Sequence, residues 1–440
     1  MLKAKPSQPT FPRRKILTST SVLKPSVIAL LLVFLVVGGV IGYALHPSPP
    51  PAPTAPTPVT LLPSVIPIGV ILTVTGDFSS YGVRAEATAK IAESEINQYV
   101  ATLGIPTSFK FYYEDYETQP DVALQKVQAL YAQGIQIVIG GMTSGAMKTI
   151  DQYVDTNHIL VIDGTSTAAR ESVAPPGDYE VRVVPAAEAE GAALTAAMIN
   201  KGFMNVAMVS SEDTYSLSIH DAFKSAYTAA GGNIVADITY AYPGTSDFTV
   251  VLNSLESAVA PLLAANKTVA VFANMWEDVA VMLNQASSRN SPLLGLTWFG
   301  PDTYSGDTVI SKDAGPVATK VKLISVQLGS PVTTRSQELN ATLMAQMGQA
   351  PDVYALATYD AAWIAALAIL QVGSYNATAV KAALPTVCSL FWGATGNTEL
   401  NAAGDRVTMD MVFWAVVMGQ WEQVGSYSSV SKEVTWSTPV

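Results

Sequence analysis

Short apolar runs alternate with segments of helical spacing along most of the chain, and this alternation restricts the possible folds more than any other feature. In the first series, strands are expected at 66–74, 108–114, 135–139 and 159–162, with helices at 84–100 and 121–132 and a third that ends near 157. The connections between these segments are short. A strand–helix alternation of this kind is typical of a parallel sheet with helices on both faces.

The alternation restarts after Pro185. A strand at 179–183 precedes it, and the elements expected after it are helices at 186–200, 217–230, 248–264 and 279–287 and strands at 206–210, 234–240, 269–273 and 296–299. The rest of the chain adds strands at 322–327, 409–417 and 421–424 and helices at 336–347, 353–372 and 378–384. The two series are alike, so the sequence predicts a second domain of similar α/β build.

A glycine-rich turn follows the apolar run 136–139 and reads GGMTSG. Its first two glycines permit a sharp change of direction, and Thr143 and Ser144 stand where a helix N-cap belongs. Free backbone N–H groups and the helix dipole suit a small anion such as a carboxylate at this place. Ligands of open α/β sheets lie outside the carboxyl ends of strands, so the turn is a candidate ligand site. An ordinary capped turn without a ligand is the alternative.

The charge is unevenly distributed and excludes one class of partner. Residues 1–24 contain six basic and no acidic residues, whereas the rest of the chain contains 18 basic and 35 acidic ones. Because phosphate contacts need lysine and arginine, nucleic acid is not expected as a partner. The single cysteine, Cys388, leaves no internal disulfide or zinc cluster to be expected.

Residues 26–45 contain no charge and are long enough, at about 30 Å of helix, to cross a bilayer. The basic residues before them predict a cytoplasmic segment at 1–25, a transmembrane anchor and an extracytoplasmic body. A cleaved signal peptide is the alternative, although its apolar region is usually shorter. The proline-rich segment 46–65 is expected to be an extended linker. We therefore expect a single-pass protein of the cell membrane.

Enzyme signatures are absent from the sequence. It has three histidines, and no pair of them has the spacing of metal ligands. The stretch GMTSG departs from a nucleophile elbow by one position, and neither a dinucleotide-binding nor a P-loop motif is present. The sequence thus predicts a protein that is not an enzyme and has no cofactor, metal or catalytic residue.

Several segments in order resemble one known family. They are TVTGDFSSYGVRAEATAKIAESEIN, YYEDYETQPDVALQKVQAL, IVIGGMTSG, VIDGTSTA, VRVVPAAEAEGAAL, VSSEDTYSLSIHDAF, MLNQA and WFGPDTY. Over about 66–430 the chain resembles the type I periplasmic binding proteins of the leucine/isoleucine/valine-binding branch, which serve ABC importers. The resemblance implies two Rossmann-like lobes with parallel sheets, joined by a hinge of three crossings. Lobe 1 would comprise 66–185 and 325–400, and lobe 2 would comprise 186–324 and 401–432.

The resemblance also implies a ligand site. The carboxylate of an α-amino acid would bind Ser144 and the backbone amides of its turn, together with the hydroxyl of Thr167 and the carbonyl of Thr165. Asp302 would hold the ammonium group, although the family often has the longer glutamate there. Tyr81, Tyr215 and Tyr354 would surround the rest of the ligand.

The sequence departs from the family at several points. Members of the family often have a disulfide in lobe 1, which this sequence lacks, and Thr143 stands at one of its cysteine positions. Gly145 stands where a polar residue is common in the family. Met275 stands where several relatives place an aromatic, which would widen the pocket. Trp276 and Trp363 are expected to pack in the core.

The function implied is that of an extracytoplasmic substrate-binding protein of an ABC importer. It would capture an amino acid (branched-chain-like) or a related small amide and deliver it to a permease in the membrane. A ligand-sensing receptor ectodomain, a binder of a nucleoside or sugar, and a hydrolase on the same scaffold are the alternatives. A sensor would need a larger cytoplasmic part than about 25 residues.

Overall fold

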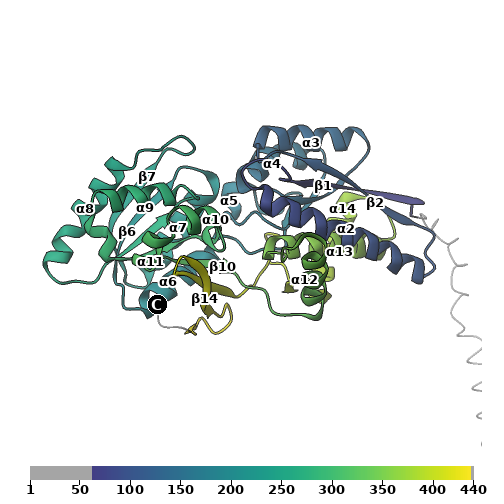
Figure 1. Ribbon diagram of the computed structural model, residues 1–440. Coiled ribbons are helices and arrows are strands. Elements are labelled where there is room, and N and C mark those ends of the chain that lie inside the picture. The colour runs from purple at the N-terminus through teal and green to yellow at the C-terminus, as the bar shows by residue number, and fades with distance from the viewer. Residues whose placement is uncertain (1–61, 438–440) are drawn as a thin grey trace, which may run out of the picture. The chain divides into compact units, whose positions relative to one another are not determined.

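The computed structural model describes residues 62–437, which belong to one compact unit that spans Thr60–Val440. The predicted cytoplasmic segment, the membrane anchor and most of the proline-rich linker lie outside the described residues. Two large sheets, each with its own helices, organise the described part (Figure 1).

The smaller sheet is entirely parallel and has the strand order β2-β1-β3-β4-β5. Its strands are β1 (Val65–Leu72), β2 (Ser108–Asp115), β3 (Ile137–Gly141), β4 (Leu160–Asp163) and β5 (Glu180–Arg182). The helices around it are α2 (Ser79–Thr102), α3 (Pro120–Ala132), α4 (Ser144–Thr156), α5 (Arg170–Val173), α12 (Thr334–Met347), α13 (Val353–Val372) and α14 (Ala377–Leu390).

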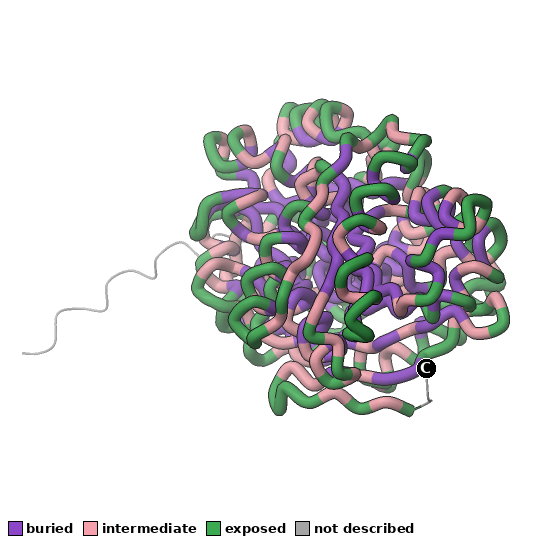
Figure 2. Tube along the Cα trace, turned by 90° about the vertical axis from the view of Figure 1, so that its left-hand side faces the viewer, coloured by how far each residue is buried: buried purple, intermediate pink, exposed green. Residues whose placement is uncertain are grey.

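Helices cover both faces of this sheet, because its strands carry apolar residues on both sides. In β3, Ile137 and Ile139 pack into the cluster that includes α2 and α13. Val138, between them, packs with α3 and α4 in another cluster. A parallel sheet buried on both faces needs such uninterrupted apolar strands. The buried residues form the interior of the described body, as the purple segments of Figure 2 show.

The larger sheet has eight strands in the order β15-β14-β13-β10-β9-β8-β6-β7. They are β6 (Asn205–Ser211), β7 (Asn233–Tyr240), β8 (Ala270–Asn274), β9 (Thr297–Gly300), β10 (Ile324–Leu328), β13 (Met411–Val417), β14 (Gln420–Tyr427) and β15 (Val434–Trp436). Its helices are α6 (Ala187–Asn200), α7 (Thr214–Ala229), α8 (Thr249–Ala264), α9 (Val279–Ser288), α10 (Thr308–Asp313) and α11 (Gly315–Lys320), with short 3-10 turns η1 (Pro292–Gly295) and η2 (Asp302–Tyr304). β6 to β10 pair in parallel and β13 to β15 antiparallel.

The chain passes between the two groups three times, after β5, after β10 and after the short hairpin of β11 (Trp392–Gly393) and β12 (Gly396–Asn397). Two boundaries predicted from the sequence need correction. The predicted boundary at 324/325 falls inside β10, which pairs wholly in the larger sheet. The boundary at 400/401 is too early, because Asp405 still forms a bridge with Arg182 of β5.

Two helix boundaries also differ from the prediction. α14 continues through Pro385 to Leu390, since its later residues Val387 and Cys388 are buried and their packing offsets the hydrogen bond that proline cannot make. α2 begins at Ser79 rather than Arg84, which places Tyr81 in its first turn. Within 62–437, α13 is the one helix long and apolar enough to cross a membrane, and most of it is buried in the body.

A buried carboxyl group on α13 makes the stability of the fold depend on pH. Asp360 accepts hydrogen bonds from Ala394 N (2.6 Å), Thr395 N (2.8 Å) and Thr395 Oγ1 (2.6 Å), and it is fully buried. Burial raises its pKa to about 6. Asp360 has a higher pKa in the folded state than in the unfolded chain. Its contribution to the stability of the folded state is therefore complete below the pKa of the unfolded chain, and it is lost as the pH rises through about 6.

We therefore expect the wild type to lose up to about 3 kcal/mol between pH 4 and pH 7 relative to Asp360→Asn, which cannot titrate. Urea unfolding of both proteins at the two pH values measures this difference. A difference that does not change with pH would contradict it.

Candidate functional site

The turns after β3 and β4 are hydrogen-bonded to each other. Ser144 begins α4, and its Oγ accepts hydrogen bonds from Ser166 Oγ (3.1 Å) and Ala168 N (3.3 Å). Thr165 Oγ1 donates to the carbonyl of Met142 (2.6 Å). Since β3 and β4 are parallel neighbours, their carboxyl ends lie at the same edge of the sheet. The two turns thus form one continuous polar surface.

Asp163, the last residue of β4, holds both turns in place. One carboxylate oxygen accepts from Met142 N (3.1 Å), and the other accepts from Thr165 N (2.9 Å) and Ser166 N (2.6 Å). Asp163 is fully buried, and burial raises its pKa while these hydrogen bonds oppose the rise. The role of Asp163 was not predicted from the sequence, although an acid at a strand end before Gly-Thr is a usable signal.

The N-terminus of α4 presents hydrogen-bond donors at this surface. Thr143 caps the helix, and its Oγ1 accepts from Ala146 N at 3.4 Å. Tyr116 accepts a hydrogen bond from Thr143 N (3.0 Å) and so fixes the start of the turn. With no acidic residue in its first turn, α4 keeps the positive end of its dipole available to an anion.

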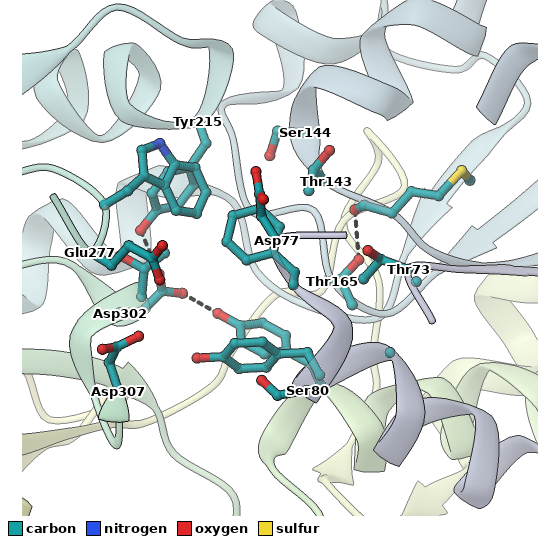
Figure 3. Close-up of a pocket in the computed structure, with 18 of the residues that line it drawn as sticks. Thr73, Asp77, Ser80, Thr143, Ser144, Thr165, Tyr215, Glu277, Asp302 and Asp307 are labelled. Atoms are coloured by element: carbon teal, nitrogen blue, oxygen red, sulfur yellow. Dashed lines mark hydrogen bonds between the residues drawn. The ribbon is translucent and has the colours of Figure 1, made fainter. Parts of the chain in front are cut away.

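The opposite side of the site is built around Asp302, which lies after β9 at the start of η2. The hydroxyl of Tyr215 donates to one of its carboxylate oxygens and the hydroxyl of Tyr354 donates to the other. Tyr215 is in the first turn of α7, and Tyr354 is in the first turn of α13, beside the smaller sheet. The Asp302 carboxylate is therefore where the two groups of elements meet (Figure 3).

Glu190 holds the backbone of Asp302 in place through a hydrogen bond. Its Oε1 accepts a hydrogen bond from Asp302 N (3.0 Å), and it lies in the first turn of α6, soon after the first passage between the groups. Both acids are buried. Burial, and then repulsion by Asp302, raises the pKa of Glu190, and burial raises the pKa of Asp302 against the two tyrosine hydrogen bonds.

One pocket contains all seven residues that the resemblance implied as ligand-binding: Tyr81, Ser144, Thr165, Thr167, Tyr215, Asp302 and Tyr354. Its free space is about 1290 Å³, part of which is open to solvent. Other residues that line it are Thr73, Asp77, Phe78, Ser80, Tyr116, Thr143, Tyr242, Trp276, Glu277, Thr303 and Asp307. The structure brings the predicted residues together, and their role in binding stays a prediction.

Trp276 is a correction to the sequence analysis. It lies in the loop between β8 and α9, not on a helix, and it lines the pocket. Met275, expected to widen the pocket, is instead fully buried in the core beside it. The aromatic side chain is thus present one position later. Trp363, in contrast, packs against Tyr99 at 5.7 Å between ring centroids, as expected.

A serine, a histidine and an aspartate meet elsewhere, on the larger sheet. His220 Nδ1 lies 3.0 Å from Ser210 Oγ, and His220 Nε2 lies 3.1 Å from Asp237 Oδ1. Ser210 is fully buried and does not line the pocket, and it also accepts a hydrogen bond from Asn274 Nδ2 (3.1 Å). Burial lowers the pKa of His220. This set joins β6, β7 and α7, and none of its three residues lines the pocket.

Comparison with known proteins places the chain in a family. Residues 65–420 match the family described as periplasmic binding protein. An uncharacterized protein of Methanocaldococcus jannaschii is 29% identical over 85% of this chain and 92% of its own length. The Leu/Ile/Val-binding protein BraC3 of Rhizobium johnstonii is 26% identical over 44% of this chain and 52% of its own length.

Solved structures share the fold. A leucine-binding protein, LivK, of Thermotoga maritima superposes with a TM-score of 0.69 at 18% identity, covering 83% of this chain and 99% of that one. A solute-binding protein of R. palustris in complex with benzoate gives 0.64 at 19% identity, covering 86% and 99%. The chain belongs to the periplasmic binding protein family, and its α/β fold with parallel sheets is the type I fold of the leucine/isoleucine/valine-binding branch.

Proposed function

We propose that this protein is the extracytoplasmic solute-binding component of an ABC importer. It captures an amino acid (branched-chain-like) or a related small amide and presents it to a membrane permease. Residues 26–45 hold it at the membrane as a single-pass anchor. The observation that carries this proposal is the pocket in which helix-terminal donors face a buried acid, within a family of solute-binding proteins.

The two sheets with their helices are two lobes. Lobe 1 comprises the elements from β1 to β5 and from α12 to β12, and lobe 2 comprises the rest. Tyr354 of lobe 1 donates a hydrogen bond to Asp302 of lobe 2, so the lobes are in contact across the pocket. A ligand that contacts both lobes favours the closed arrangement, because only a difference in affinity between the two states shifts their balance.

The polar residues have complementary roles toward a zwitterion. The Ser144 hydroxyl, the Thr167 hydroxyl and the free amides of α4 bind the carboxylate, and the carbonyl of Thr165 and the Asp302 carboxylate bind the ammonium group. A buried zwitterion needs donors at one end and acceptors with negative charge at the other. Tyr81, Tyr215 and Tyr354 enclose the rest of the molecule.

Isothermal titration with a panel of amino acids, small amides, nucleosides, sugars and benzoate tests this proposal. We expect at least one amino acid or amide to bind with a Kd in the micromolar range or below. Binding by none of them, or only by a nucleoside or a sugar, would contradict the proposed ligand class.

Replacing Ser144 with alanine is expected to weaken amino-acid binding about tenfold, with a melting temperature that falls by a few degrees. The loss has two sources, since the Ser144 hydroxyl both faces the pocket and accepts two hydrogen bonds from the second turn. Titration and thermal unfolding measure the two effects. Ser144→Thr, which retains a hydroxyl, is the control, and an unchanged affinity in Ser144→Ala would exclude a direct contact.

A further inference from the structure

The pocket carries more negative charge than an ordinary amino acid can neutralise. Four carboxylates line it, those of Asp77, Glu277, Asp302 and Asp307, whereas none of its lining residues is a lysine, arginine or histidine. Arg84 is near Tyr81, 5.2 Å from the ring centroid, but it pairs with Asp352 at 2.6 Å and does not line the pocket. The α-ammonium group of a bound amino acid would neutralise the charge of Asp302, and the other three carboxylates would remain without a counter-charge.

These three carboxylates come from separate loops and line the same pocket. Asp77 precedes α2, Glu277 lies between β8 and α9, and Asp307 precedes α10. Asp307 and Asp77 each raise the pKa of Glu277, after burial as the largest cause, so both lie within electrostatic reach of Glu277. None of the three has a cationic partner among the ion pairs of the described residues. A bound cation would lower the electrostatic energy of these nearby negative charges.

Aromatic rings adjoin the same carboxylates. Trp276 precedes Glu277, and its ring centroid lies 4.9 Å from that of Phe78, 5.0 Å from that of Tyr215 and 6.1 Å from that of Tyr242. All four rings line the pocket. The faces of aromatic rings attract ammonium and guanidinium groups, and this attraction adds to that of nearby carboxylates.

Three of the four carboxylates lie on one side of the pocket, and the hydroxyl and helix-terminal donors lie on the other. Figure 3 shows Glu277, Asp302 and Asp307 on the side of Tyr215, and Thr143, Ser144 and Thr165 on the other side, with Asp77 between them in this view. A molecule with a carboxylate at one end and a positive charge at the other matches this arrangement.

We propose that the ligand is a basic amino acid, with its α-carboxylate at the start of α4 and its side-chain cation among Asp77, Glu277 and Asp307, beside the Trp276 ring. This inference rests on the proposed amino-acid-binding function, and it replaces the branched-chain-like side chain proposed there with a basic one. A branched-chain amino acid fills the apolar space but leaves the three carboxylates without a counter-charge.

Two pairs of ligands of matched shape test the charge directly. Citrulline has a neutral urea group where arginine has a guanidinium group. Norleucine lacks the terminal ammonium group of lysine. Titration of the full-length chain, purified in detergent, is expected to show at least 30-fold tighter binding of the cationic member of at least one pair. The preference should decrease as salt is raised, since salt screens the partly exposed carboxylates.

Variants locate the charge. Glu277→Gln and Asp77→Asn are each expected to reduce the preference for the cation at least fivefold, and neither side chain forms a described hydrogen bond that the fold would lose. Glu422→Gln is the matched control, because Glu422 is exposed on β14 and does not line the pocket. A preference unchanged by both pocket variants would overturn the assignment. Thermal unfolding confirms that each variant is folded.

The outcomes separate the two proposals. Equal or tighter binding of citrulline and norleucine would overturn the basic ligand and leave the amino-acid-binding function in place. Binding of cadaverine as tight as that of lysine would overturn the role of the α-carboxylate. Absence of binding for every amino acid and amide would overturn the proposed function itself, and the basic ligand with it.

Discussion

Replacing Asp302 with asparagine is expected to weaken amino-acid binding by about 100-fold or more. Asp302 is 2% exposed, and we assign it the ammonium group of the ligand. Truncating one partner of a buried, hydrogen-bonded charge pair costs roughly 2–5 kcal/mol, because the other charge is left in the pocket without a counter-charge. Isothermal titration of the wild type and the variant measures the loss.

Folding of the Asp302→Asn variant has to be measured separately, because the carboxylate also accepts hydrogen bonds from Tyr215 and Tyr354. The amide retains one of the two acceptor oxygens, so the melting temperature should fall only slightly. Asp155→Asn is the matched control, since Asp155 is exposed near the end of α4 and does not line the pocket. An affinity that changes less than threefold in Asp302→Asn would show that Asp302 does not hold the ammonium group.

The second large effect is expected on stability. Replacing Asp163 with alanine should lower the free energy of unfolding by about 3–5 kcal/mol, because three backbone N–H groups, two of them buried and one half-buried, lose their acceptor. The same change releases the turns that carry Ser144 and Thr167, so ligand affinity should fall as well. Urea unfolding measures the loss of stability.

Asp163→Asn gives the matched comparison. Asparagine retains one acceptor oxygen, which can serve Thr165 N and Ser166 N while its amide group faces Met142 N. We expect it to lose about half as much stability as the alanine variant. Equal losses in the two variants would show that the hydrogen bonds of the carboxyl group are not the cause.

The order of the strands along the chain could be predicted from the sequence because buried parallel strands leave a strong local signal. The runs that became β1, β3 and β4 are apolar and β-branched, and polar residues follow each of them. The turn that carries Ser144 could be placed for the same reason, since ligands lie outside the carboxyl ends of parallel strands, whereas Thr167 was assigned from the resemblance to the family.

The sequence was less informative wherever tertiary contacts decide the structure. A proline usually ends a helix, but α14 passes Pro385 because the residues beyond it are buried against the core. β10 was divided between the lobes because its pairing with β13, more than 80 residues later, leaves no local trace. Such pairings depend on the whole sheet rather than on neighbouring residues.

Several acidic and aromatic residues of the pocket were not predicted as part of it. Asp77, Glu277 and Asp307 lie in loops, where acids are common and usually only solvated. Their significance comes from convergence in space, since separate loops bring them to one pocket. Trp276 was expected in the core because it was assigned to an apolar helix, but it lies in the loop after β8 and lines the pocket.

A crystal structure of the protein with its tightest-binding amino acid would show directly how the pocket holds its ligand. We expect the ligand carboxylate within hydrogen-bonding distance of the hydroxyls of Ser144 and Thr167, and its ammonium group within that distance of Asp302. A ligand bound elsewhere, or bound in this pocket with its carboxylate directed at Asp302, would contradict this expectation.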